Sequence, residues 1–194
     1  MGLLFLFWTL GFTFIDKSHI FWLTKTYLNK FLPGPATLPF INLNAFNFWG
    51  LILGLERIKD NTIFLGLSLS LWAWFFAIVF FLTILVKFWR DGDIFFASLM
   101  MFFAAFMFLP RVHERYLYPI FVFFPLVLIK YPKLTKIFLA LSFTFLVNLY
   151  HWWWFPKISF LVYLLDFEIF ERFFSFINFA IFFYLFKIYL KAKV

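Results

Sequence analysis

The densest group of residues that could do chemistry lies between two long apolar runs. Its members are Arg111, His113, Glu114, Arg115 and Tyr116. Charged groups beside a membrane-spanning run are costly to bury and usually mark a site or an anchor. Guanidinium groups form charge-assisted hydrogen bonds with phosphate, so the cluster favours a phosphate-bearing ligand. The alternative is an interfacial anchor, in which the arginines reach lipid headgroups and Glu114 pairs with Arg111 or Arg115.

The elements around the cluster have the composition of a membrane protein. Of the 194 residues, 65% are hydrophobic and 28% are aromatic, which is more apolar surface than a soluble domain of this size can hide. The apolar runs are continuous, whereas the strands of a membrane barrel alternate polar and apolar residues. We therefore expect an all-α fold, a polytopic transmembrane bundle of about six helices with external interfacial helices.

The apolar runs predict where these elements lie within a single transmembrane domain over residues 1–194. Residues 2–15 are apolar but short for a full span. Residues 16–62 are expected to form an external loop with an amphipathic helix at 20–31. Within that loop, residues 46–55 form a short interfacial or re-entrant piece, and residues 158–168 form a second surface segment. Full spans are expected at residues 63–86, 94–110, 116–129, 137–152 and 173–190.

The cluster is thus expected at the amino-terminal end of the helix over residues 116–129, where unpaired backbone N–H groups would add donors. Lysine and arginine are concentrated in the short turns at 87–93 and 130–136. The positive-inside rule places such turns in the cytoplasm. We therefore expect a multi-pass protein of the cytoplasmic (plasma) membrane, with a cytoplasmic C-terminus and the charged cluster outside.

The formal net charge of +8 does not indicate a nucleic-acid partner, because the basic residues lie mostly at the ends of apolar runs, where they meet lipid headgroups. Membrane lipids are the expected partners. The chain has no cysteine, which excludes disulfides and thiol chemistry. His19 and His151 lie far apart without an acidic ligand pattern, so no metal site and no cofactor are predicted.

For the other polar residues and Trp49, the sequence favours structural or solvent-exposed positions. His151 and Trp49 are expected to lie at the membrane interface, and Asn148 to make a hydrogen bond between helices. The acidic residues near the C-terminal span are expected to be solvated, with a divalent cation as the open alternative. They are Asp166, Glu168 and Glu171.

Two sequence motifs resemble a known family. The run Pro-Arg-Val-His-Glu-Arg-Tyr-Leu-Tyr-Pro at 110–119 resembles the His-Glu motif of the GT-C superfamily of membrane glycosyltransferases. The run Asn-Leu-Asn-Ala-Phe-Asn-Phe-Trp at 42–49 resembles the Asn-Ala-(Phe/Tyr)-Asn-(Leu/Phe)-Trp segment that precedes that motif. Asn-Leu-Tyr at 148–150 is a weaker similarity. The first two together are fairly specific, and the resemblance covers residues 20–155.

This resemblance implies a mannosyltransferase-like enzyme that transfers a hexose, such as mannose, from a polyprenyl-phosphate donor at the outer membrane face. Arg111, His113 and Arg115 would then bind the carrier phosphate, with Tyr116 in the same site. Glu114 would orient His113 or an arginine. A further pair, Asn44 and Asn47, would either hydrogen-bond the substrate or cap the loop.

Members of the family are generally longer and carry a catalytic acid in an earlier external loop. The resemblance therefore implies the C-terminal part of a larger module, with the missing N-terminal half as a partner. Asp16 stands where the acid that deprotonates the acceptor would lie in a complete chain; the alternative is a solvated aspartate at a helix end. The rival function is a non-catalytic, lipid-phosphate-binding protein of flippase-like or scaffold type.

Overall fold

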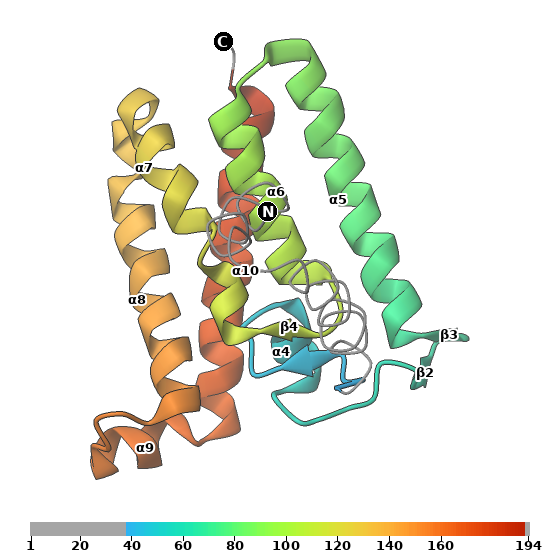
Figure 1. Ribbon diagram of the computed structural model, residues 1–194, viewed down its shortest axis with the longest axis vertical. Helices are drawn as coiled ribbons and strands as arrows, with labels where there is room; N and C mark the ends of the chain where they lie inside the picture. The colour runs from blue at the N-terminus through green and yellow to red at the C-terminus, as the bar shows by residue number, and fades with distance from the viewer. Residues whose placement is uncertain (1–37, 193–194) are drawn as a thin grey trace, which may run out of the picture. The chain divides into compact units, whose positions relative to one another are not determined.

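The computed structural model describes residues 38–192 (Figure 1), and residues 40–192 belong to one compact unit. Asp16, His19 and the elements expected at 2–15 and 20–31 lie outside the described residues. Helices make up 72% of the described part, so the expected all-α helical bundle is confirmed.

Three of the described helices are long and apolar enough to cross a membrane. They are α5 (Leu69–Asp91), α8 (Thr135–Trp153) and α10 (Glu168–Lys191). Helix α6 (Ile94–Phe108) is apolar but has only 15 residues, and α7 (Ile120–Lys130) has 11. These five helices lie in the ranges where full spans are expected, with shifted boundaries, but α6 and α7 are too short to count among the three candidate spans, so full spans at residues 94–110 and 116–129 are not confirmed.

The first of these spans begins later than the sequence predicts. Residues 63–68 form a hairpin in which β2 (Ile63–Phe64) pairs antiparallel with β3 (Leu67–Ser68). The turn residues Leu65 and Gly66 have positive φ angles of 50° and 82°, as in the two-residue turns that suit a hairpin. The predicted start at residue 63 is wrong because an unbroken apolar run does not distinguish a short strand from a helix.

The helix after the charged cluster also begins later than predicted. Residues 114–117 form a short 3₁₀ helix, η2 (Glu114–Leu117), and α7 begins at Ile120, directly after Pro119. The cluster therefore precedes α7 and does not lie in its first turn. The expectation that the N–H groups of this helix add donors to the cluster is wrong.

The short apolar piece expected at 46–55 contains helix α4 (Phe48–Leu53), which packs against α10. Trp49 is buried, and its indole N–H donates a hydrogen bond to the Phe108 carbonyl at 2.9 Å. The prediction that Trp49 lies at the membrane interface is therefore wrong. The second surface segment contains helix α9 (Ser159–Leu165), whose Phe160 and Tyr163 are exposed.

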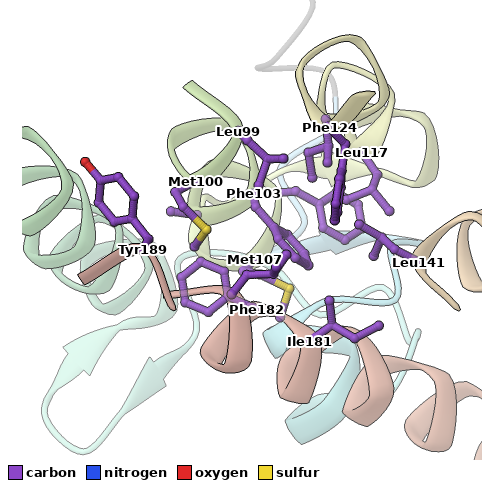
Figure 2. Close-up of a cluster of buried hydrophobic side chains, with 14 of the residues drawn as sticks. Leu99, Met100, Phe103, Met107, Leu117, Phe124, Leu141, Ile181, Phe182 and Tyr189 are labelled. Atoms are coloured by element: carbon purple, nitrogen blue, oxygen red, sulfur yellow. The ribbon is translucent and has the colours of Figure 1, made fainter. Parts of the chain in front are cut away.

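The main hydrophobic core surrounds α6, which contacts α5, α7 and α10. Figure 2 shows its side chains gathered with those of α7, α8 and α10. The labelled residues are Leu99, Met100, Phe103, Met107, Leu117, Phe124, Leu141, Ile181, Phe182 and Tyr189. Helix α6 is thus the inner helix. The outer helices keep large apolar side chains exposed, as helices that face lipid do.

The bundle has two ends with different contents (Figure 1). One end, here the site end, carries α4, α9, the β2–β3 hairpin, and the strands β1 (Asn42–Leu43) and β4 (Val112–His113). The opposite end, here the turn end, carries the α5–α6 turn, the short 3₁₀ helix η3 (Pro132–Leu134) and the C-terminal end of α10. The described loops thus group at two ends in the alternation that the sequence predicts.

Candidate functional site

The two motifs singled out in the sequence meet at the site end. Strand β1 pairs parallel with β4, so that Asn42 lies opposite Val112 and Leu43 lies opposite His113. The Arg111 N–H also donates to the Ile41 carbonyl at 3.0 Å. A parallel pair needs a long crossover connection, which α5 and α6 supply. The charged cluster is therefore fixed by its backbone to the 42–49 segment.

Arg111 is held by an acid that the sequence analysis did not single out. Its Nε donates to Asp60 Oδ2 at 2.7 Å, and Asp60 is 5% exposed. Asp60 precedes an apolar run and belongs to no motif, so its position in sequence gives no signal of this contact. The side chain of Arg111 stays one-third exposed. The contact with Asp60 therefore fixes the direction of a side chain that is still partly exposed.

Glu114 is the fully buried member of the cluster. Its Oε1 accepts a hydrogen bond from Arg115 at 3.2 Å, and its Oε2 lies 3.7 Å from His113 Nδ1. Among the described residues, Oε2 has no hydrogen-bond partner. Of the two pairings considered from the sequence, Glu114 makes the one with Arg115. Its carboxylate also lies beside His113, where it can orient the imidazole.

The surroundings of His113 favour its neutral form. Burial lowers its pKa below the ordinary value, the charge of Arg115 lowers the pKa further, and Glu114 opposes both effects only in part. A neutral imidazole has one donor and one acceptor nitrogen. The positive charge of the cluster at pH 7 therefore comes from Arg111 and Arg115.

Arg115 and Tyr116 form the outward face of the cluster. About half of each side chain is exposed, and the Arg115 guanidinium lies 5.8 Å from the centre of the Tyr116 ring. The rings of His113 and Tyr116 meet edge to face at 5.4 Å. This geometry presents a cation, a half-buried imidazole and a phenol on one surface, which suits an anionic ligand with an apolar or sugar portion.

The asparagines of the first motif have different positions. Asn47 is fully buried; its Oδ1 accepts from the N–H groups of Trp49 and Gly50, and its Nδ2 donates to the Phe106 carbonyl. It therefore caps α4 and braces the loop, which is one of the two roles considered from the sequence. Asn44 is partly exposed, has a positive φ of 63° and forms a bridge with His113. Asn44 therefore lies in the part of the loop that is next to the charged cluster.

Two buried asparagines from the spans hold this loop, and we call them the asparagine clamp. Asn148 of α8 accepts from the Phe46 N–H at 3.0 Å and donates to the Asn44 carbonyl at 2.7 Å. Asn178 of α10 donates to the Phe46 carbonyl at 2.8 Å, and the Thr144 hydroxyl lies 2.6 Å from its Oδ1. Asn148 was expected to make a hydrogen bond between helices, but its side chain forms hydrogen bonds with the backbone of the loop. Asn178 was missed, although a polar side chain inside an apolar span was the available signal.

A second buried polar contact lies near the clamp. His151 Nε2 lies 3.3 Å from Glu171 Oε1, and the imidazole is buried against the rings of Phe46 and Trp154. The predictions that His151 lies at the interface and that Glu171 is solvated are therefore wrong, since the side chain of Glu171 is only 14% exposed. Asp166 and Glu168 are exposed as expected. Within residues 38–192, no group of three or more His, Asp or Glu side chains could hold a metal ion.

No protein-family model, curated protein or solved structure matches this chain. The chemistry assigned to the site end therefore depends on its own geometry and on the two motifs that meet there.

Proposed function

We propose that the site end binds the phosphate of a polyprenyl-phosphate-linked hexose, such as polyprenyl-phosphate mannose. The chain would act as a membrane glycosyltransferase of GT-C type, or as the carrier-binding C-terminal portion of one. The observation that supports this most is the β1–β4 pairing, which brings the 42–49 and 110–119 motifs to one surface. These two motifs carry the resemblance of the sequence to that superfamily.

The proposed roles follow from exposure and charge. Arg115 and Arg111 would hold the phosphate oxygens, and His113 would donate a further hydrogen bond. Negative charge grows on the phosphate as the sugar leaves, so the cations would stabilise the transition state more than the bound donor. Glu114 would keep Arg115 in place, and Tyr116 would contact the sugar or the first isoprene unit.

The remaining roles are contact with the donor and deprotonation of the acceptor, and they are assigned to residues outside the 111–116 cluster. Asn44, beside His113, would contact the donor, while Asn47 would brace the loop. The acid that deprotonates the acceptor would be Asp16 or a residue of a missing N-terminal half. The site end would face the outside of the cytoplasmic membrane, which leaves the C-terminus in the cytoplasm.

A second candidate function has an observation in its favour. The two described acids at the cluster, Asp60 and Glu114, are buried and lie against arginines. Neither is exposed as a general base should be. A non-catalytic lipid-phosphate-binding protein would need only the arginines.

The test is binding of a short-chain polyprenyl-phosphate hexose to the detergent-purified chain. We expect Arg115→Ala and Arg111→Ala to weaken binding at least tenfold, since each removes a charge-assisted hydrogen bond of about 1.5–3 kcal/mol. Arg57→Ala is the matched control, because Arg57 is an exposed arginine of the same loop region. Equal binding by wild type and Arg115→Ala would refute the phosphate site.

A separate measurement distinguishes the two functions. Release of free hexose or transfer to an added acceptor by the same preparation would indicate an enzyme. Binding that depends on Arg115 would favour the non-catalytic protein if no transfer occurs, even with a longer chain that includes an N-terminal half of the GT-C type.

A further inference from the structure

The β2–β3 hairpin extends sideways from the bundle beside the first turn of α5 (Figure 1). Its apolar side chains are all exposed, by between 43% and 78%. They are Ile63, Phe64, Leu65 and Leu67. A cluster of this kind on a small projecting element requires a partner that covers it.

The exposure involves both faces of the hairpin. Ile63 and Phe64 are consecutive strand residues, so they point to opposite faces, and both are exposed. A hairpin that packed one face on the bundle and turned the other to water would alternate apolar and polar residues. The β2–β3 hairpin instead exposes apolar side chains on both faces, so its surroundings on both sides must be apolar.

The hairpin is held firmly to α5. The Leu69 N–H donates to the Thr62 carbonyl at 2.9 Å, and the Ser70 N–H donates to the Asp60 carbonyl at 2.8 Å. The Trp72 indole N–H donates to the Phe64 carbonyl at 2.9 Å. The apolar tip is therefore presented in a defined position next to the start of the span.

The exposed surface of the hairpin continues into that of α5. Leu71, Trp74 and Phe75 in the first two turns of the helix are exposed, and residues 61–86 contain no Asp, Glu, Lys or Arg. Because α5 is long and apolar enough to span a membrane, the surface that continues from the hairpin is the lipid-facing surface of the span.

The length of α5 fixes the depth of the hairpin. Its 23 residues extend about 34 Å at 1.5 Å per residue, against a hydrocarbon thickness of about 30 Å. The first turn of α5 therefore lies at the boundary between acyl chains and headgroups, where Trp72 and Trp74 are typical residues. Water at this boundary also satisfies the outer backbone groups of a two-stranded hairpin, which the centre of a bilayer would not.

We propose that the β2–β3 hairpin is a membrane-interface anchor. Its tip inserts among the acyl chains just below the headgroups of the leaflet at the site end. This anchor sets the depth of α5 and, through Asp60 and its contact with Arg111, the height of the charged cluster above the acyl chains. The proposal does not depend on the function of that cluster.

The absence of cysteine from the chain makes a direct test simple. Leu65→Cys at the tip is labelled with an environment-sensitive fluorophore, and the labelled chain is reconstituted into phosphatidylcholine–phosphatidylglycerol liposomes. Emission is measured with nitroxide-bearing lipids, either shallow or deep, and with iodide in the water. Ile78→Cys in the middle of α5 is the deep control, and the exposed Glu56→Cys is the aqueous control.

We expect the Leu65 label to lose more emission with shallow nitroxide than with deep nitroxide and to be protected from iodide. The Ile78 label should respond most to deep nitroxide, and the Glu56 label to iodide. Leu67→Cys repeats the measurement should Leu65→Cys fold poorly. Quenching of the tip by iodide would overturn the proposal. Protection from both lipid nitroxide and iodide would also overturn it and would indicate contact with a second protein chain.

Discussion

At the site end, buried polar side chains from distant parts of the sequence hold a loop, whereas at the turn end the α5–α6 turn is capped by its own residues. Asn178 reaches the Phe46 carbonyl from 132 positions away. By contrast, Gly92 ends α5 with a φ of 71°, and Asp93 next to it caps α6 by accepting from the Phe96 N–H. The turn end also has an ion pair, Asp93 with Lys130, at 3.3 Å.

This difference separates two uses of polar residues in a membrane protein. The turn end only has to reverse the chain in a wet environment, and local caps suffice for that. The site end keeps an irregular loop buried between helices, where every unpaired backbone group is costly. Buried asparagines satisfy those groups, and the exposed cations are then held on a rigid support.

The largest effect should come from breaking the asparagine clamp. Asn148→Leu leaves the Phe46 N–H and the Asn44 carbonyl without partners inside the bundle, which should lower the free energy of unfolding by about 2–5 kcal/mol. Thermal unfolding in detergent measures it. Ser142→Ala in the same helix removes a hydroxyl that bonds only its own helix and should change stability little. Equal effects of the two substitutions would show that the clamp does not support the loop.

The next effect concerns the packing of α4. A Cβ on Gly50 would lie 2.7 Å from the Ala45 carbonyl oxygen and 2.9 Å from Ser175 Oγ. Gly50→Ala should therefore destabilise the protein by roughly 1–3 kcal/mol through overpacking, although alanine normally stabilises a helix by about 1 kcal/mol relative to glycine. The same thermal unfolding assay decides the sign, and a gain in stability would contradict the close packing of α4.

A matched pair of substitutions compares an ion pair at each end. Asp60→Asn weakens the support of Arg111 and should cost about 1–2 kcal/mol, because Asp60 is buried and bonds a charged donor. Asp93→Asn acts on a pair whose lysine is exposed and should cost less than Asp60→Asn, since solvent screens such a pair. Asp60→Asn alone should also weaken binding of the glycosyl phosphate. A larger loss of stability for Asp93→Asn would reverse the comparison.

The smallest effect should be a pH dependence confined to the site end. Burial, followed by Arg115, lowers the pKa of His113 from about 6.5. The imidazole therefore gains its proton only as the pH falls below that ordinary value. From pH 7 to about 5, the added charge should strengthen binding of a glycosyl phosphodiester a few-fold, or by about 1 kcal/mol.

Stability should change in the opposite direction over the same range. The unfolded chain takes up the proton at His113 at a higher pH than the folded chain does, so acidification lowers the free energy of unfolding. His113→Gln should remove both pH dependences when binding and thermal unfolding are followed from pH 7 to about 5. Unchanged pH profiles in this variant would show that another group titrates.

The sequence predicted the helical bundle, the α5–α6 and α7–α8 turns, and the cluster at one end, because long apolar runs and the charges between them specify these features directly. It failed at residues 63–68, where apolar composition concealed a hairpin. It also failed at residues 116–119, where proline delayed the start of α7.

Within the site, the sequence predicted the residue types but not their contacts. Asp60 with Arg111 and His151 with Glu171 join positions that share no motif and no helical spacing. Such pairs depend on the parallel β1–β4 pairing and on the packing of α8 against α10, which local patterns do not encode. The capping role of Asn47 was one of the two alternatives that the sequence left open, since asparagine before an apolar segment is a typical N-cap.

The parallel pairing of β1 with β4 also constrains biosynthesis. During synthesis, β1 emerges before α5 and α6, so its partner strand does not exist until both helices have been made and inserted. The Asn178 contact then waits for α10. The loop that carries the first motif is therefore completed only once α10 has been made, although it is synthesised before α5. A ribosome-bound chain that ends before residue 178 should leave this loop accessible to protease, and release of the full chain should protect it.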